Sequence, residues 1–116
     1  INVGSNMQAM VDVAVLRLAG NFPAETVVRS FQVITRAIVL MTEGQFLDMS
    51  AEDAQEMSLE SYFRMTGGKT AALIEGALRA GALLGTEDEA RIESMAAFGR
   101  GFGLAFQSRD DYLGIW

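Results

Sequence analysis

A single proline, Pro23, interrupts this chain of 116 residues. Proline breaks helix interiors because it lacks the backbone N–H and because its ring clashes with the preceding turn. The rest of the chain is dominated by Ala, Leu, Met, Glu, Gln and Arg, which are good helix formers. We find no segment with the alternation of apolar and polar residues that is typical of a half-buried strand. The sequence therefore predicts the all-α fold class.

Apolar residues at helical spacing divide the chain into four predicted helical regions. The first covers about residues 6–18, and the second covers about residues 24–49 with Pro23 at its first turn. An acidic linker over residues 50–57 follows, and Ser58 is a suitable N-cap for a third region that reaches about residue 84. Thr86 and Glu89 have the spacing of a capping box, which predicts a fourth helix from there to the end.

Composition excludes several classes of function. The 9 Lys and Arg residues against 15 Asp and Glu residues give a net charge of −6, which disfavours binding to nucleic acid through its phosphates. Because the chain has no His and no Cys, an imidazole mechanism, a thiolate metal site and a cysteine nucleophile are excluded. No apolar run approaches the ~20 residues of a membrane span, and no secretory signal is visible. We therefore expect a cytoplasmic location.

The two ends of the chain bear on its domain organisation. The sequence opens on Ile1 rather than Met, and it stops at Trp116 without any terminating signal. A chain of this length is one domain or less. We interpret residues 1–116 as a single partial domain that belongs to a longer protein.

Three predicted helices carry polar residues on the face that periodicity assigns to the interior. In the second region this face consists of Val27, Phe31, Ile34, Ile38 and Met41, followed by Gln45 and Asp48. In the third it consists of Tyr62, Met65, Lys69, Leu73, Gly76 and Ala80. In the fourth it consists of Ile92, Ala96, Gly99, Gly103, Phe106 and Asp110, with Gln107 and Asp111 beside it. Buried charge normally survives only when it is paired, hydrogen-bonded or bound to metal.

The charges on these faces predict a cation site. Asp48, Asp110 and Asp111 face the single Lys69, so the interior end of the bundle is short of positive charge. Oxygen ligands without His or Cys favour Mg²⁺, with Mn²⁺ as the second choice, and phosphate oxygens typically complete the metal shell. The alternative is that each apolar face simply reaches solvent where its polar residues begin.

Glycines mark two expected irregularities. Gly67 and Gly68 predict a kink or break beside Lys69 and Thr70, because glycine weakens helix interiors. The pair does not belong to a phosphate-binding loop, because Phe63 stands where that motif requires glycine. Further along, Gly99 and Gly103 are spaced for close approach of a neighbouring helix. The phenylalanines at helical spacing fit either the core or a hydrophobic channel for an alkyl substrate; they are Phe31, Phe98, Phe102 and Phe106.

Taken in order, several short motifs resemble the polyprenyl (isoprenyl) diphosphate synthase family. They are Ile1-Asn2-x-Gly4, Gly44-Gln45-x-x-Asp48, Gly68-Lys69-Thr70-Ala71-Ala72, Gly81-Ala82 and Gly99-x-x-x-Gly103-x-Ala105-Phe106-Gln107-x-x-Asp110-Asp111. The resemblance covers essentially the whole chain. It implies part of an all-helical bundle of the isoprenoid synthase type, built around a deep central cavity. It also implies a homodimer that joins isopentenyl diphosphate to an allylic diphosphate.

The resemblance assigns a role to each motif residue that binds substrate. By it, Lys69 and Thr70 hold the allylic diphosphate, and Gln107 lies near the departing oxygen. Phe106 lines the cavity beside the reacting carbons. Gln45 also belongs to the substrate-binding set. Lys69 and Gln107, together with the acidic Asp110, form the catalytic set that the family implies.

The resemblance likewise assigns the metal ligands. Asp110 and Asp111 match the second aspartate-rich motif, whose carboxylates bind Mg²⁺ directly or through water, and Asp48 supports this cluster. That motif usually ends in a third Asp, but Gly114 stands at the position here. The family's first aspartate-rich motif would precede Ile1, so we expect this fragment alone to be inactive.

Two other interpretations stay open on the sequence. In the first, Gly114 marks a decayed site, and the chain belongs to a non-catalytic helical relative that acts in dimerisation or partner binding. In the second, the chain belongs to a terpene cyclase with the same fold.

Overall fold

The computed structural model describes residues 2–51 and 56–115, and all regular elements in these ranges are helical. Ile1, Trp116 and residues 52–55 of the expected acidic linker lie outside the described residues. The elements are α1 (Asn2–Arg17), η1 (Leu18–Gly20), α2 (Ala24–Ala51), α3 (Leu59–Thr66), η2 (Gly67–Ala71), α4 (Ala72–Gly85) and α5 (Glu89–Ile115). The predicted all-α class is confirmed, although α1 begins about one turn earlier than expected. No helix in the described ranges is long and apolar enough to cross a membrane.

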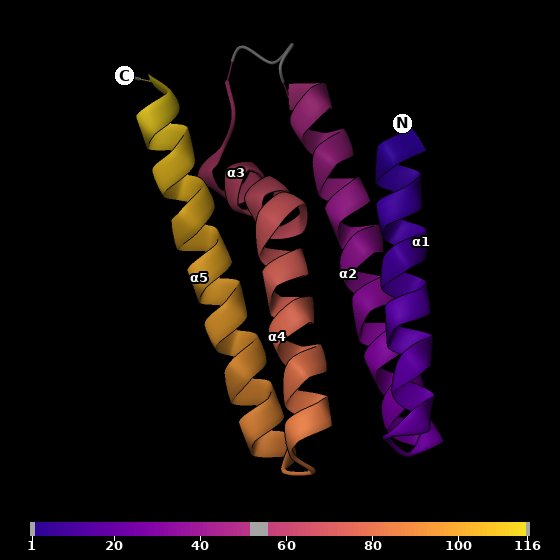
Figure 1. The fold of residues 1–116 in the computed structure, drawn as a ribbon. Coiled ribbons are helices and arrows are strands. Elements are labelled where there is room, and N and C mark those ends of the chain that lie inside the picture. The colour runs from indigo at the N-terminus through magenta and orange to yellow at the C-terminus, as the bar shows by residue number, and fades with distance from the viewer. Residues whose placement is uncertain (1, 52–55, 116) are drawn as a thin grey trace.

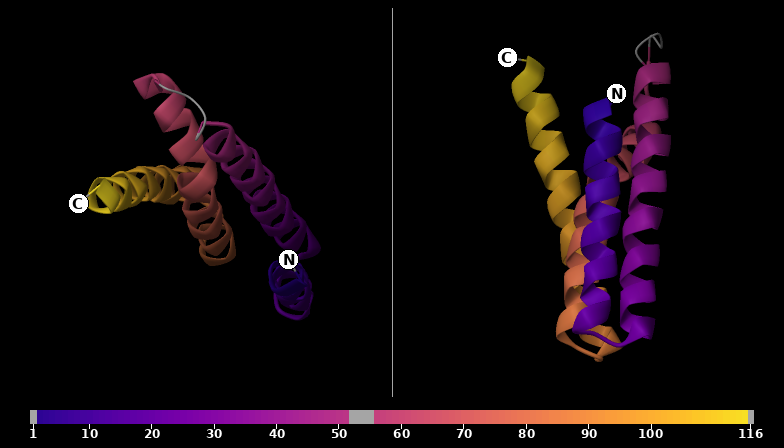
Figure 2. Two further views of the ribbon diagram at one scale, coloured as in Figure 1. Left: turned by 90° about the horizontal axis from the view of Figure 1, so that it is seen from above. Right: turned by 45° about the vertical axis from the view of Figure 1, so that its right-hand side comes forward.

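The long helices lie side by side, and α4 occupies the centre of the arrangement (Figure 1). On its two sides α4 packs against α2 and α5, while α1 lies against the outer side of α2 (Figure 2). The described part of the chain therefore resembles a bent row of helices more than a closed bundle, with principal extents of 51 × 36 × 21 Å. The η2 turn, where α3 joins α4, contacts both α2 and α5.

Local hydrogen bonds explain where two of the helices begin. Ser58 caps α3 as predicted, because its hydroxyl accepts a hydrogen bond from the Ser61 backbone N–H at 3.1 Å. The predicted capping box of Thr86 and Glu89 is wrong. Asp88 caps α5 instead, accepting from the Ala90 N–H at 2.9 Å, and the Thr86 hydroxyl accepts from the Asp88 N–H at 3.1 Å. The helix starts later because an Asp carboxylate caps at least as well as a Thr hydroxyl.

The third predicted region is divided by the π-helical turn η2, which contains both Gly67 and Gly68. The irregularity expected at these glycines is thus confirmed as a local widening of the helix. The buried face of α4 consists of Ala72, Gly76, Ala80 and Leu83. Leu73, one residue after Ala72, lies beside this face and is 42% exposed, which corrects the expected stripe.

Small residues let the helix backbones approach closely. A Cβ atom on Gly99 would lie 2.9 Å from the Glu75 Cα, and one on Gly103 would lie 2.5 Å from the Ala71 Cα. Both distances are far shorter than an ordinary carbon–carbon contact. The expected close approach at Gly99 and Gly103 is therefore confirmed, and it brings α5 against α4 and η2.

The buried faces differ in part from the predicted ones. On α2 the residues of the predicted stripe after Val27 are only half-buried at Phe31, Ile34, Ile38 and Met41. The fully buried residues of α2 are Val27, Ser30, Ala37 and Gly44. These are mostly small, because they lie where α2 comes closest to its neighbours: a Cβ on Gly76 of α4 would lie 2.6 Å from the Ala37 Cβ.

Of the two interpretations of the phenylalanines, a place in the core of the described helices is wrong for three of them. Phe98, Phe102 and Phe106 are 62%, 52% and 49% exposed. Their rings stack along α5 with centroid separations of 6.2 Å. Gly99 and Gly103 lie on the side of α5 that packs against α4 and η2. Phe98 and Phe102, each one residue before a glycine, therefore lie away from this side.

Candidate functional site

The π-helical turn η2 holds the two residues that the sequence singled out for phosphate binding, Lys69 and Thr70. Close packing fixes this turn against α2. A Cβ atom on Gly44 would lie 2.6 Å from the Gly68 carbonyl carbon, and one on Gly68 would lie 2.9 Å from the Leu40 carbonyl oxygen. Side chains at both positions are thus excluded by backbone, which cannot rotate away. Asp48, one turn after Gly44 on α2, comes to lie beside Lys69 as a result.

Lys69 and Asp48 form an ion pair across the α2–η2 contact. The Lys69 Nζ donates to the Asp48 Oδ2 at 2.5 Å, and their side chains are 31% and 25% exposed. The sequence places Lys69 on an inward face, and Asp48 is the acid that pairs with it in the structure. Gln45 belongs to the same helix but is exposed, so the structure brings together Asp48 and Lys69 without it.

A chain of hydrogen bonds links η2, α5 and α3. The Thr70 hydroxyl donates to the Gln107 Oε1. The Gln107 Nε2 donates to the Asp111 Oδ1 at 2.8 Å, and the Tyr62 hydroxyl donates to the Asp111 Oδ2 at 2.6 Å. The two neighbouring residues of η2 therefore contact different helices: Lys69 contacts α2, and Thr70 contacts α5.

Tyr62 is a site residue that sequence reasoning missed. It entered the sequence analysis only as a member of an apolar stripe. A tyrosine on an inward face needs a hydrogen-bond partner for its hydroxyl, and this is the signal that could have found it. Burial raises the pKa of the Tyr62 phenol, the hydrogen bond and charge of Asp111 raise it further, and Ser108 acts in the opposite direction. The phenol is consequently a protonated hydrogen-bond donor at neutral pH.

Asp110 and Phe106 do not lie on the inward line of α5. Both are exposed, whereas Gln107 and Asp111 are half-buried and continue the line that passes through Gly103. The expectation that Phe106 and Asp110 extend the buried stripe is wrong. The inward line continues from Gly103 in steps of four residues to Gln107 and Asp111, so Phe106 and Asp110 lie beside it. Asp110 is adjacent to Asp111 but turned toward the outside of the described helices.

The acidic residues of the described helices offer only part of a site for a divalent cation. Residues 2–51 and 56–115 contain no group of three or more acidic side chains that could hold a metal ion by themselves. Mg²⁺ is typically bound by one or two carboxylates plus substrate phosphates and water, however. Each Asp111 oxygen accepts one hydrogen bond and keeps a further lone pair. Asp111 therefore retains the oxygen lone pairs that such a partial site needs.

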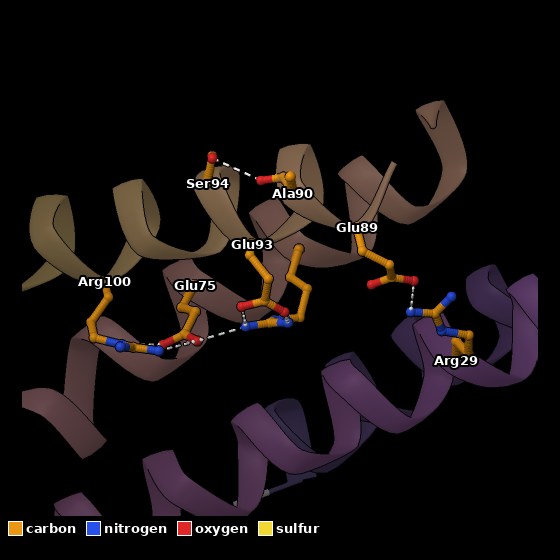
Figure 3. Close-up of polar contacts among 8 residues, drawn as sticks. Arg29, Glu75, Glu89, Ala90, Glu93, Ser94 and Arg100 are labelled. Carbon is orange, nitrogen blue, oxygen red and sulfur yellow. Dashed lines mark hydrogen bonds and ion pairs between the residues drawn. The ribbon is translucent and has the colours of Figure 1, made fainter. Parts of the chain in front are cut away.

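A second polar cluster clamps α4 to α5 away from these residues (Figure 3). Arg100 of α5 makes two hydrogen bonds to Glu75 of α4, at 2.8 Å and 2.7 Å, and Arg79 of α4 pairs with Glu93 of α5. The hydrogen bond from Arg100 lowers the pKa of Glu75 despite the partial burial of that carboxyl, and Arg79 lowers it further. At the N-terminal end of α5, Arg29 of α2 contacts Glu89 at 2.7 Å (Figure 3).

A groove of about 770 Å³ lies between α2 and the α3–η2 segment. Its lining includes Leu40, Gly44, Leu47, Arg64 and Gly68. Neither Lys69 nor the hydrogen-bonded chain from Thr70 to Tyr62 contributes to it. The candidate site therefore consists of the polar contacts around η2, and this open groove is not part of it.

Comparison with known proteins gives consistent matches. A family model described as polyprenyl synthetase matches residues 1–116. The geranylgeranyl diphosphate synthase of Sulfolobus acidocaldarius is 38% identical over 93 residues, which cover 80% of this chain and 28% of the relative. The (2E,6E)-farnesyl diphosphate synthase of Mycobacterium tuberculosis is 38% identical over 87 residues, which cover 75% of this chain and 24% of the relative.

Solved structures match over a similar share. The crystal structure of a polyprenyl synthetase from Streptomyces coelicolor A3(2) superposes with a TM-score of 0.87 at 35% identity, over 100% of this chain and 33% of that one. The geranylgeranyl pyrophosphate synthetase structure from Pyrococcus horikoshii gives a TM-score of 0.77 at 36% identity, over 80% of this chain and 28% of that one. The chain thus spans about a quarter to a third of the length of these relatives.

Proposed function

Because the chain belongs to the polyprenyl synthetase family, we propose that the protein carrying it is a prenyltransferase. In this proposal it condenses isopentenyl diphosphate with an allylic diphosphate, and the carbon–oxygen bond to the allylic diphosphate breaks first. The helices described here correspond to part of the isoprenoid synthase fold. The named relatives are synthases of geranylgeranyl and farnesyl diphosphates, which supports a prenyl diphosphate as product.

One observation carries the proposal: η2 places a cation and a hydroxyl next to each other between two helices that bear carboxylates. Lys69 lies toward Asp48 of α2, and Thr70 lies toward Gln107 of α5. A diphosphate needs positive charge and hydrogen-bond donors at its oxygens. We assign Lys69 and Thr70 to the allylic diphosphate, with Asp48 holding the ammonium group in place and Gln45 contributing from the same helix.

The proposed chemistry depends on stabilising the diphosphate as it departs. Negative charge grows on its oxygens as the bond breaks, and fixed positive charge aimed at that point lowers the barrier. Mg²⁺, or Mn²⁺ as second choice, would supply further neutralisation when held by Asp110 and Asp111 together with phosphate oxygens. The side chain of Gln107 is fixed at both ends, by Thr70 and Asp111, which supports its assignment near the departing oxygen.

The remaining assignments concern the prenyl chain and the assembly. Phe106 is adjacent to Gln107 and is exposed on α5, so an apolar substrate can reach its ring. We assign this ring to the cavity beside the reacting carbons. Exposed apolar residues on α1, such as Met7 and Met10, support a homodimer. We keep the cytoplasm as the proposed location, and we propose no nucleic-acid partner for this acidic chain.

The test is a prenyltransfer assay on the full-length protein with Mg²⁺, isopentenyl diphosphate and geranyl or farnesyl diphosphate. We expect release of inorganic diphosphate and a longer linear prenyl diphosphate, identified by mass spectrometry. Lys69→Ala should raise the KM for the allylic substrate, and Asp110→Ala should reduce kcat by about 100-fold or more. Arg91→Ala is the control, because Arg91 is a cation that is 77% exposed on α5 away from these residues.

The same assay separates the rival functions. Gly114 at the place of a third Asp favours a non-catalytic relative, for which no diphosphate is released under any condition. A cyclic hydrocarbon product would indicate a terpene cyclase. Wild-type rates in Lys69→Ala or Asp110→Ala would remove the roles assigned to those residues, even if the wild-type protein is active.

A further inference from the structure

The carboxylate of Asp111 is held from two different elements. Gln107, four residues earlier on α5, donates to Oδ1 at 2.8 Å, and Tyr62 of α3 donates to Oδ2 at 2.6 Å. Tyr62 is 49 residues away in sequence and belongs to none of the motifs that carry the family resemblance. It contributes the single contact from α3 to this hydrogen-bonded chain among the described residues.

The local structure fixes Tyr62 at this position. Ser58 caps α3, and its hydroxyl receives the Ser61 N–H. One turn later Thr66 is fully buried, and its hydroxyl donates to the Tyr62 carbonyl at 2.9 Å. The Tyr62 ring also makes an edge contact with Phe63, with ring centroids 5.5 Å apart. The phenol therefore extends from a short, well-anchored helix toward α5.

We infer that Tyr62 is a positioning residue of the proposed metal and diphosphate site, which acts by fixing the orientation of the Asp111 carboxylate. This inference rests on the proposed function. A carboxylate turns easily about the bond that joins it to Cβ, because that torsion has a broad energy profile. Donors on both oxygens, one from α5 and one from α3, remove this freedom. One lone pair on each oxygen is left for magnesium or its bound water.

The loss of Tyr62 would leave Asp111 held only by Gln107. Gln107 ties only Oδ1 to η2, because its own Oε1 accepts a hydrogen bond from the Thr70 hydroxyl. Tyr62 ties the second oxygen, Oδ2, to α3, which runs directly into η2. Residues that orient a metal ligand typically change metal affinity by 10-fold to 100-fold when they are removed.

A competing interpretation gives the opposite sign. In it, the hydrogen bond from Tyr62 occupies Asp111 and must break before the metal can bind. Removing the hydroxyl would then tighten metal binding. The positioning role instead requires weaker binding, so a measured affinity separates the two interpretations.

The experiment measures binding of inorganic diphosphate to the full-length protein by calorimetry, at increasing concentrations of MgCl₂. Tyr62→Phe removes only the hydroxyl, and we expect it to weaken the magnesium-dependent binding by about 10-fold. In steady-state kinetics the same variant should raise the magnesium concentration needed for half-maximal rate more than it lowers kcat at saturating magnesium.

Two further variants isolate the mechanism. Ser58→Ala removes the cap of α3 but keeps the Tyr62 hydroxyl and the hydrogen bond from Thr66 to the Tyr62 carbonyl, so it should lower the melting temperature and weaken magnesium-dependent binding far less than Tyr62→Phe. Asp111→Asn should weaken binding, and adding Tyr62→Phe to it should cause little additional loss, because Tyr62 acts through Asp111. An equal loss of binding in Ser58→Ala and Tyr62→Phe would mean that α3 matters only as a support, which overturns the inference.

The outcomes also distinguish this inference from the proposed function. If the wild-type protein transfers prenyl groups but Tyr62→Phe binds magnesium diphosphate as well as wild type or more tightly, only the role of Tyr62 is refuted. If the wild-type protein neither binds magnesium diphosphate nor transfers a prenyl group, the proposed function is refuted and the role of Tyr62 with it.

Discussion

Replacing Gly103 with alanine should separate α5 from the π-helical turn that carries Lys69 and Thr70. The added Cβ would lie 2.5 Å from the Ala71 Cα and 3.0 Å from the Ala71 Cβ. An ordinary contact between carbon atoms needs about 3.5–4.0 Å, so the two elements must move apart by roughly 1 Å. The obstructing atom belongs to the backbone and cannot turn aside.

The expected magnitude follows from two opposing effects. Alanine is better than glycine in a helix interior by about 1 kcal/mol. Forcing extra volume into a packed contact costs about 1–3 kcal/mol, and the upper end applies here because both neighbouring atoms are fixed. The free energy of unfolding should therefore fall by about 2 kcal/mol. Gly101 is the matched control: nothing lies within 4 Å of its added Cβ, so Gly101→Ala should gain about 1 kcal/mol.

Urea unfolding of the full-length protein, followed by far-UV circular dichroism, measures both variants against wild type. The proposed function adds a second expectation, because the Thr70–Gln107 hydrogen bond lies one residue from Ala71 and one turn from Gly103. Gly103→Ala should lose prenyltransfer activity, while Gly101→Ala should retain it. Equal stability of the two alanine variants would refute the close packing of α5 on η2.

Two other predictions concern carboxylates. The pKa of Glu75 is lowered in the folded chain, so its contribution to stability is present above its ordinary pKa of 4.5 and is lost as the pH falls through the folded value. Glu75→Gln should therefore lower the free energy of unfolding by about 1 kcal/mol at neutral pH; the effect is small because the partner Arg100 is exposed and solvent screens the pair. When unfolding is measured at decreasing pH, the difference between the variant and wild type should vanish. Asp111→Asn should cost about 1 kcal/mol in thermal unfolding because one hydrogen bond to the carboxylate is lost. The free energy of unfolding of Asp110→Asn should stay within about 0.5 kcal/mol of wild type. Both aspartate variants should lose activity. Equal destabilisation by the two variants would contradict the exposed position of Asp110.

Much of the architecture could be predicted from the sequence because helix formation is governed by local composition and periodicity. The single proline, the Ser58 cap and the glycine pair at 67–68 located helix starts and the irregularity in the third region correctly. The pairing of Lys69 with Asp48 was also within reach, since an inward-facing cation requires a partner.

Periodicity failed where the inward face of a helix is very narrow. On α4 the buried face runs through Ala72, Gly76 and Ala80, so Leu73, one residue beside it, is exposed. On α5 the close contact at Gly103 selects one line of residues, and Phe106 and Asp110 lie beside that line. A rotation of about 100° per residue separates the half-buried carboxylate of Asp111 from the exposed carboxylate of Asp110.

The sequence by itself determined that this protein is helical, where its helices lie along the chain, and which residues resemble a prenyl diphosphate synthase. These properties depend on neighbours within a few turns. Only the tertiary structure decided that Tyr62 reaches Asp111, that Thr70 meets Gln107, and that Asp111 rather than Asp110 is the carboxylate held in place. Such pairings join helices far apart in sequence, and they are set by how closely glycine and alanine let the backbones approach.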